Sequence, residues 1–334
     1  MAGNDTSPRK TRELHNHHMD STVWNDFEFR DDDVIVATYA KSGTTWTQQI
    51  VGQLVFGGAE DVPLHEISPW LDLRIMPPDT KEKLAAQTHR RIIKTHLPLD
   101  ALTVSPKANY IYIGRDGRDV VWSFYNHHAN ANQLWYDALN NTPGLVGPPI
   151  ERPDRDIGRY FRRWLEEDGY PLWSYWENVR TWWGARHEPN VLLVHFNDLK
   201  ADLEAEMRNI AAFLNCTIPE DRWPLLLEHC SFDYMKTHAA DVAPLGGAIF
   251  EGGATVFINK GVNGRWRDVL TDKDVADYER KAHEELGADC AKWLSQGARG
   301  RQCQLSTQSG HQSGGKTSQS SIALGVSSAV DGAT

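Results

Sequence analysis

Four short apolar segments, each followed by a polar turn, dominate the pattern of this chain. Segments of this length that are rich in Val and Ile are typical of strands covered on both faces. Apolar residues at helical spacing separate them. This alternation predicts an α/β fold with a mostly parallel central sheet and helices on both faces. The predicted strands cover residues 34–37, 91–95, 110–113 and 191–196, and the predicted helices cover 44–55, 160–165, 172–183 and 199–214.

The first thirty residues differ from this body. Residues 1–30 are polar and predict a solvated N-terminal arm. His15, His17 and His18 lie close together in it, but no cysteine or carboxylate stands at ligand spacing beside them. Solvation is therefore favoured over metal binding.

Other segments lack the regular pattern. Residues 60–80 combine prolines with apolar side chains, and residues 126–156 are rich in Asn, Pro and Gly, which predicts a long mobile segment that acts as a lid. Residues 298–334 are mainly Ser, Gln and Gly and predict a disordered, low-complexity tail. The predicted folded domain is 31–297.

Charge and cysteine content exclude several classes of partner. The chain has 35 basic and 45 acidic residues, a net charge of −10, so it repels nucleic acid and anionic membranes as a whole. No apolar run approaches the roughly 18 residues needed to span a bilayer. The four cysteines lack Cys-x-x-Cys spacing, which indicates neither a zinc site nor a disulfide framework. The sequence predicts a soluble, cytoplasmic protein without a metal site.

A candidate anion site follows the first predicted strand. Lys41 supplies a positive charge, Gly43 allows close approach of the backbone, and the N–H groups of 42–46 stand at a helix N-terminus. This loop has the logic of a P-loop, but the Gly-x-x-x-x-Gly-Lys-Ser/Thr sequence is absent. The pattern indicates a phosphorylated ligand and argues against ATP or GTP hydrolysis.

Polar residues also follow the next two predicted strands. Lys94 and His96 stand at the end of one, and Arg115 stands directly after the other. Ligands of parallel sheets bind beyond the carboxyl ends of the strands. We therefore expect these side chains to share a site with Lys41.

Taken together, these segments resemble the cytosolic-type sulfotransferases, the family that uses 3′-phosphoadenosine 5′-phosphosulfate (PAPS). Four motifs occur in the family's order, and the resemblance covers about residues 31–293. Ala40 stands where proline is usual. The motifs are Thr-Tyr-Ala-Lys-Ser-Gly-Thr-Thr-Trp at 38–46, Lys-Thr-His-Leu-Pro at 94–98, Arg-Asp-Gly-Arg-Asp-Val-Val-Trp-Ser at 115–123 and Lys-Gly-Val-Asn-Gly-Arg-Trp at 260–266.

The resemblance implies transfer of a sulfuryl group from PAPS to a hydroxyl acceptor without a metal. It implies that His96 is the catalytic base, and that Lys41 and Lys94 stabilise the leaving oxygen. Trp46 either stacks on the adenine or is the first core residue of its helix. The cofactor-binding residues that the resemblance implies are Lys41, Ser42, Gly43, Thr44, Thr45, Trp46, Arg115, Ser123, Phe196, Cys230, Asn259, Lys260 and Gly261.

Three of these residues depart from the family's pattern. Phe196 replaces a tyrosine that reaches the adenine, and Cys230 replaces a threonine. Asn259 replaces an arginine of the phosphate clamp, so either cofactor affinity is lower or Arg265 or Arg267 compensates. The animal enzymes' dimer motif is not intact, so the oligomeric state stays open.

The acceptor is not readable from the sequence. A phenol, an alcohol or the head of a glycolipid all suit the loops at 60–80 and 126–156. Two other functions remain as alternatives: a P-loop kinase with Asp198 as a magnesium ligand, and a non-catalytic protein with a degenerate nucleotide site.

Overall fold

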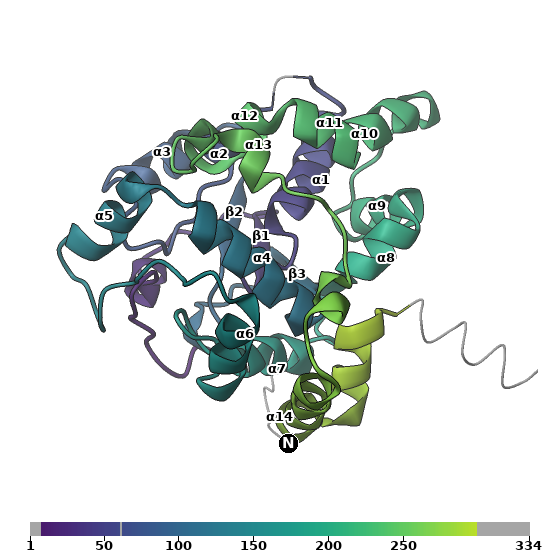
Figure 1. Cartoon of the computed structure of the whole chain (residues 1–334). Helices are drawn as coiled ribbons and strands as arrows, with labels where there is room; N and C mark the ends of the chain where they lie inside the picture. The colour runs from purple at the N-terminus through teal and green to yellow at the C-terminus, as the bar shows by residue number, and fades with distance from the viewer. Residues whose placement is uncertain (1–7, 61, 299–334) are drawn as a thin grey trace, which may run out of the picture.

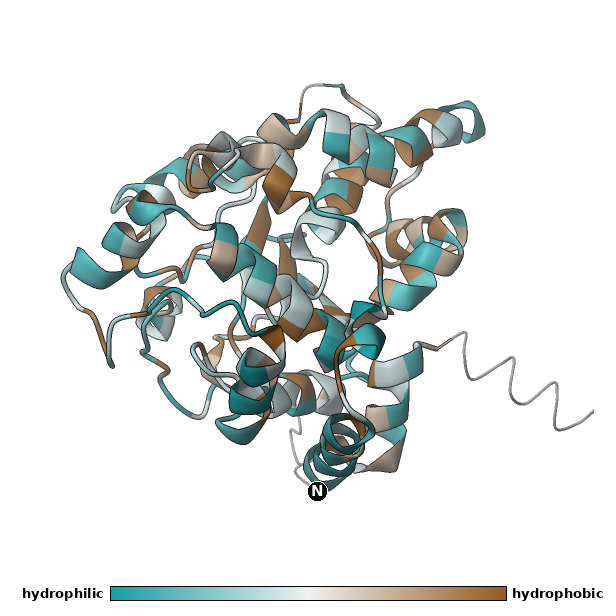
Figure 2. Ribbon diagram, in the orientation of Figure 1, coloured by the Kyte–Doolittle hydropathy of each residue, from teal (hydrophilic) through white to brown (hydrophobic). Residues whose placement is uncertain are grey.

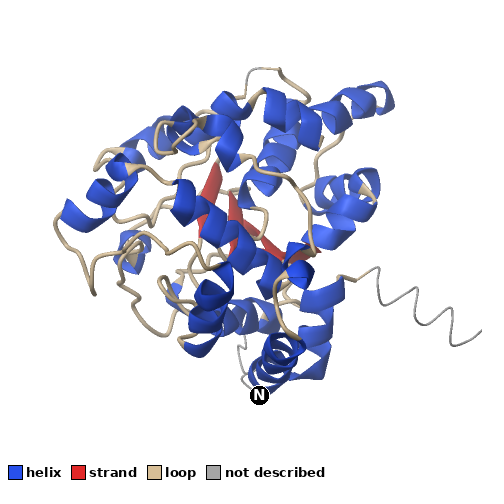
Figure 3. Cartoon of the chain, viewed as in Figure 1, coloured by secondary structure: helices blue, strands red, loops and turns tan. Residues whose placement is uncertain are grey.

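A single parallel sheet lies at the centre of the computed structural model, which describes residues 8–60 and 62–298. Its strands run in the order β2-β1-β3-β4, and every neighbouring pair is parallel (Figure 3). Val36 of β1 pairs with both Lys94 of β2 and Ile111 of β3. All four predicted strands are confirmed, and so is the α/β fold class. The strands are β1 (Val34–Thr38), β2 (Ile92–Thr95), β3 (Asn109–Gly114) and β4 (Val191–His195).

Helices surround this sheet (Figure 1). The longer ones are α1 (Thr44–Phe56), α4 (Gly117–Asn130), α5 (Gln133–Asn141), α6 (Ile157–Glu166), α7 (Tyr175–Gly184), α9 (Leu203–Phe213) and α14 (Asp272–Gln296). The shorter ones are α2 (Leu64–Ile67), α3 (Thr80–Ala86), α8 (Phe196–Ala201), α10 (Trp223–His229), α11 (Phe232–Thr237), α12 (Ala239–Val242) and α13 (Ala254–Phe257). Single 3-10 turns occur at Ser21–Trp24, Leu99–Ala101, Glu220–Arg222, Pro244–Gly247 and Arg265–Asp268.

Alternate residues of each strand belong to different cores, as expected of a sheet covered on both faces. Val34 and Val36 pack with α1, α9 and α10, whereas Ile35 and Ala37 pack with α4, α6, α7 and α14. In the ribbon coloured by hydropathy the strands at the centre are largely brown, whereas the surrounding helices alternate between brown and teal residues (Figure 2). The predicted tryptophan stripe of α7 is core, with Trp176 and Trp182 fully buried.

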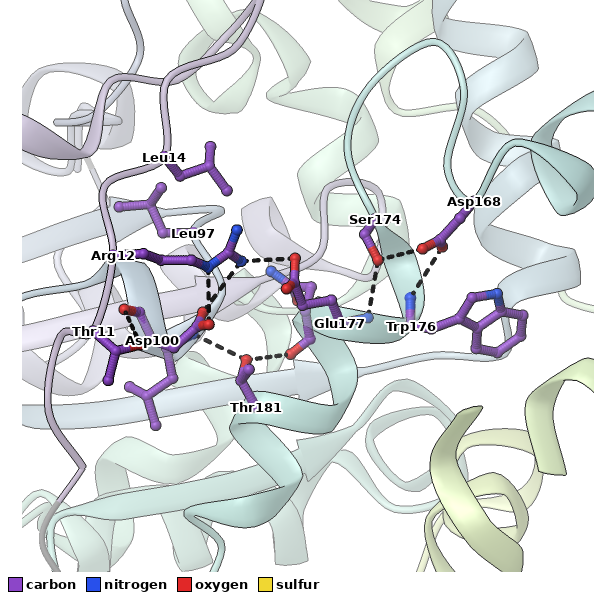
Figure 4. A network of polar contacts seen from close by, with 12 residues as sticks. Thr11, Arg12, Leu14, Leu97, Asp100, Asp168, Ser174, Trp176, Glu177 and Thr181 are labelled. Carbon is purple, nitrogen blue, oxygen red and sulfur yellow. Dashed lines mark hydrogen bonds and ion pairs between the residues drawn. The ribbon is translucent and has the colours of Figure 1, made fainter. Parts of the chain in front are cut away.

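Residues 8–30, the described part of the N-terminal segment, are not the solvated arm that their polarity predicts. Met19 and Trp24 are fully buried, and His17 and His18 are each only 6% exposed. Arg12 binds Asp100 at 2.9 Å and Glu177 at 2.7 Å, which ties the segment to α7 (Figure 4). The few apolar residues of this segment are enough to anchor it.

Residues 126–156 are also more regular than predicted. The segment completes α4 and contains α5, which buries Trp135, Tyr136 and Leu139 in a small core of its own. The predicted tail, 298–334, lies outside the described residues except for Ala298. No disulfide joins Cys216, Cys230 or Cys290 within the described part of the chain.

Candidate active site

The loop between β1 and α1 offers backbone N–H groups to an anion. Gly43 has a φ of 124°, and a Cβ there would stand 2.9 Å from Ile113 and from Phe196, so only glycine fits. None of the described side chains caps the N-terminus of α1 by a hydrogen bond. An anionic ligand is the partner that such a helix start favours.

His96 is held in the orientation of a general base. Its Nδ1 lies 2.8 Å from the carbonyl oxygen of Thr38. Because a carbonyl only accepts, the proton lies on Nδ1, and Nε2 carries the free lone pair. Burial and the charge of Lys94 lower the pKa of His96 well below its usual value, so the ring is neutral at pH 7.

Two lysines stand beside this histidine, and both have lowered pKa values. Burial, with the nearby charges of Lys94 and Arg115, lowers the pKa of Lys41 to about 7. Burial lowers the pKa of Lys94 to about 8, while the Asp72 carboxylate acts in the opposite direction. Lys41 Nζ lies 4.4 Å from the Phe257 ring centre. A bound anion would favour the charged form of both lysines. The two ammonium groups are therefore suited to stabilising negative charge that develops on a ligand.

Trp70 and Asp72 hold this arrangement, and sequence reasoning missed both roles. The Trp70 ring centre lies 4.5 Å from that of His96 and 4.8 Å from Lys94 Nζ. Its indole N–H donates to Asp72, which also accepts from Trp24 and Thr95. Burial raises the pKa of Asp72 to about 6. The sequence signal that could have indicated this contact is Trp-Leu-Asp at 70–72, in which an acidic residue follows a loop tryptophan by two positions.

Arg115 follows β3 and lies beside Lys41 in the loop between β1 and α1. Its guanidinium carbon stands 4.1 Å from the Phe196 ring centre, and its Nη groups donate to the Lys41 carbonyl and to Asn263. Its Nε is buried and has no hydrogen-bond partner among the described residues. A guanidinium held in the wall of the cavity fits a phosphate group.

The segment 259–265 lies beside Arg115, which donates to Asn263. Gly261 has a φ of 61°, and its carbonyl oxygen accepts from Lys200 at 2.6 Å. The Gly264 N–H donates to Asp119 at 2.7 Å. Lys200 and Arg265 line the cavity beside Asn259, whereas Arg267 does not and stacks on Trp266 instead.

Trp46 is partly buried at the start of α1, and its stacking on the adenine stays a prediction. Its ring is half-buried, meets Phe196 edge to face at 5.4 Å and donates its N–H to the Cys230 carbonyl oxygen at 2.8 Å. The Cys230 side chain lies in the hydrophobic core. The structure therefore brings the backbone of Cys230, and not its thiol, to the site.

One cavity of about 1330 Å³ connects these groups. All the predicted site residues line it except Ser42 and Cys230. Asp198, the magnesium ligand of the kinase alternative, does not line it, and its carboxylate accepts the Ala298 N–H at 2.8 Å. The lining also includes Trp70, His127, His128 and Trp135, which belong to the segments 60–80 and 126–156 that were expected to suit the acceptor. His18 and Trp173 line the cavity as well, and the sequence did not predict either of them there.

Two kinds of feature are absent from residues 8–60 and 62–298. No group of three or more His, Cys, Asp or Glu side chains is placed to hold a metal ion. No helix combines the length and the apolar character needed to cross a membrane. The predicted cytoplasmic location stays a prediction.

Comparisons with known proteins agree with this geometry. The profile of the Sulfotransferase domain family matches residues 31–289. A Glycolipid sulfotransferase of Mycobacterium bovis is 32% identical over 307 residues, which covers 84% of this chain and 93% of the relative. Sulfotransferase 1A1 of Rattus norvegicus is 30% identical over 258 residues, which covers 75% of this chain and 81% of the relative.

Solved structures agree as well. Retinol dehydratase in complex with retinol and PAP, 3′-phosphoadenosine 5′-phosphate, superimposes with a TM-score of 0.63 at 25% identity, covering 79% of this chain and 84% of that one. Mouse sulfotransferase SULT7A1 complexed with PAP gives a TM-score of 0.62 at 23% identity, covering 82% and 91%. The second likeness concerns the fold alone.

Proposed function

This chain belongs to the sulfotransferase family, and from that premise we propose that it transfers a sulfuryl group from PAPS to a hydroxyl of a large, mostly apolar acceptor. The observation that carries the proposal is the placement of His96, with Nδ1 bound to Thr38 and the ring beside Lys94, in the wall of the cavity. A neutral base next to two cations is the combination that sulfuryl transfer needs.

His96 takes the proton. The acceptor oxygen forms a bond to sulfur while the bond from sulfur to the phosphate oxygen breaks, and Nε2 receives the hydroxyl proton. The electron pair of the broken bond stays on the phosphate oxygen, where Lys41 and Lys94 stabilise the new charge. Bound PAPS supplies the activated sulfuryl group, and the chain supplies the base and the cations.

The nucleotide is held by separate parts of the cavity. The N-terminus of α1, with Thr44 and Thr45, binds the 5′-phosphosulfate through N–H groups and hydroxyls. Arg115 and Ser123 bind the 3′-phosphate. The place of Arg115 and Ser123 in the wall of the same cavity supports this assignment. Trp46 and Phe196 lie beside each other and offer aromatic faces to the adenine.

The remaining part of the cavity favours an amphipathic acceptor. The rest of its wall is mainly apolar. The apolar residues come from α2, the loop after it, α5, α11 and α12: Leu64, Ile67, Leu73, Ile75, Leu139, Met235 and Val242. A pocket for a drug-sized ligand measures about 300–1,000 Å³, and this cavity exceeds that range. Room for an alkyl or acyl chain besides the nucleotide fits a glycolipid, in accord with the similarity to the glycolipid sulfotransferase of Mycobacterium bovis.

The test is His96→Ala, assayed with PAPS and a panel of alcohol, phenol and glycolipid acceptors. Turnover should fall by about 10²-fold or more, because a general base contributes that much. Binding of PAP, measured by calorimetry, should be nearly unchanged. His187→Ala, at an exposed position, is the matched control. Undiminished turnover in folded His96→Ala protein would remove the base assignment.

A further inference from the structure

Two asparagines outside the cavity wall connect Arg115 to α8. Arg115 Nη2 donates to the Asn263 side-chain oxygen at 2.6 Å, and the Asn263 side-chain N–H donates to the Asn197 side-chain oxygen at 2.6 Å. Asn263 belongs to the segment between α13 and α14, which runs past α8 (Figure 1). Neither asparagine lines the cavity, whereas Arg115 does. An effect of the pair on a bound nucleotide therefore passes through Arg115.

The direction of these hydrogen bonds is fixed by the guanidinium. Because a guanidinium only donates, Asn263 has to turn its carbonyl oxygen towards Arg115. Its NH2 group then faces Asn197, which has to accept through its own side-chain oxygen. Hydrogen bonds in such a chain polarise one another. The two asparagines therefore act as one unit, which we call the asparagine relay.

The relay starts from a firmly held part of the fold. Asn197 is the second residue of α8, and its backbone N–H donates to His195 Nδ1 at 3.1 Å. His195 Nε2 in turn donates to the carbonyl oxygen of Leu294 in α14 at 2.9 Å. The same helix contributes Phe196, whose ring centre lies 4.1 Å from the Arg115 guanidinium carbon. Helix α8 thus holds Arg115 both by an aromatic ring and by a chain of amides.

These contacts fix the guanidinium and leave donors for a ligand. Nη1 of Arg115 donates to the Lys41 carbonyl oxygen at 3.1 Å, and Nη2 donates to Asn263. Each Nη nitrogen carries two hydrogens, so one N–H on each remains. Neither acceptor is a carboxylate, so no direct ion pair competes with a phosphate. A cation that is ordered before binding loses less side-chain entropy when the phosphate arrives.

We propose that Asn263 and Asn197 are positioning residues for Arg115, which hold its guanidinium in the orientation that binds the 3′-phosphate of the cofactor. The relay rests on the proposed function, because that function assigns the 3′-phosphate to Arg115. It adds two residues to which the family resemblance gives no role. The relay strengthens phosphate binding by order, whereas the arginine missing at 259 would strengthen it by charge.

The test is the ratio of the affinities for PAP and AMP, which differ by the 3′-phosphate, measured by calorimetry on the full chain. Asn263→Leu is similar in size and cannot bind Arg115. The ratio should fall by about three- to tenfold, since ordering a long side chain on binding costs about that much affinity. Asn197→Leu should lower the ratio by less, because Asn263 keeps its bond to Arg115. Asn141→Leu, at an exposed position of α5, is the control and should keep the ratio.

AMP separates positioning from a general structural effect. A variant that only disturbs the segment 259–265 would lose affinity for both nucleotides equally, so an unchanged ratio in both folded variants would overturn the relay. The relay acts through the guanidinium, so Asn263→Leu should cause no further fall when Arg115→Lys is already present. A fall as large as in the wild type would also overturn it. Should Asn263→Leu not fold, Asn197→Leu decides alone.

The proposed function has its own outcome in the same experiment. A wild type that binds neither nucleotide and does not turn over PAPS would contradict the proposed function, and the relay with it. A wild type that prefers PAP, with a ratio that neither substitution changes, would remove the relay and leave the proposed function in place.

Discussion

Trp70 donates its indole N–H to the carboxylate of Asp72 at 2.5 Å, and this bond holds the indole beside both Lys94 and His96. Asp72 also accepts from Trp24 in the N-terminal segment and from Thr95 at the end of β2. One buried carboxylate thus connects the N-terminal segment, the loop before α3 and the end of β2. The two groups that we propose to act in catalysis, Lys94 and His96, depend on a residue that does not line the cavity.

Asp72→Asn should affect both stability and the pH profile. An amide cannot accept all the bonds of the carboxylate, so the free energy of unfolding should fall by about 1–3 kcal/mol. The lost charge should lower the pKa of Lys94, because Asp72 raises it. The alkaline limb of the kcat profile should therefore move to lower pH. Denaturant melts and pH–rate profiles measure the two effects.

Exposed Asp221→Asn is the control for Asp72→Asn. If the variant lost stability while its pH profile stayed in place, Asp72 would be a structural residue only.

PAP binding should take up protons and weaken as pH rises. Free Lys41 has a pKa of about 7 and free Lys94 of about 8, both lowered mainly by burial. A bound anion favours the charged forms, which raises both values. Affinity should be constant below pH 7 and fall as pH rises through 7 and 8. Calorimetry at pH 7.5 in buffers of different ionisation enthalpy measures the uptake.

Lys41→Arg should remove the part of this pH dependence near 7, because a guanidinium stays charged there. Equal heats in all buffers for the wild type would contradict the assignment of lowered lysine pKa values.

Arg115→Lys should weaken recognition of the 3′-phosphate alone. The planar fork stacks on Phe196 and an ammonium cannot reproduce it. Affinity for PAP should fall by about 10–100-fold, as expected for loss of a charge-assisted hydrogen bond. AMP lacks the 3′-phosphate, and its affinity should hardly change. An equal loss for both nucleotides would place Arg115 elsewhere on the cofactor.

Asn259→Arg should strengthen PAP binding, because it restores a cation to the cavity wall near Ser123. The gain should be largest at low salt. Arg265→Ala should weaken binding, since Arg265 lines the cavity, and Arg267→Ala should not, since Arg267 lies against Trp266. Comparing the three variants by PAP titration identifies the residue that compensates for Asn259. Weaker binding by Asn259→Arg would reject the missing-cation interpretation.

Much of the fold was predictable because the signals are local. Four β-branched runs, each ended by a polar turn, are confirmed as parallel strands, and Lys94 and His96 stand at a strand end as predicted. The errors concern segments whose order depends on distant partners. The segment around His17 and His18 reads as polar, yet Met19 and Trp24 bury it against the body. Residues 126–156 contain α5, whose buried side chains pack against Ile75, Leu172 and Ile249 from other segments.

The strand ends, the phosphate loop and the charged residues that follow them can be predicted from the sequence, because parallel strands place consecutive turns at one edge of the sheet. The structure is needed to show which nitrogen of His96 carries the proton, that Asp72 holds Trp70, and that His18 and His128 both lie near Trp135. These relationships join residues far apart in the chain. Local propensity and spacing carry no information about such pairings, which arise when separate elements pack around one cavity.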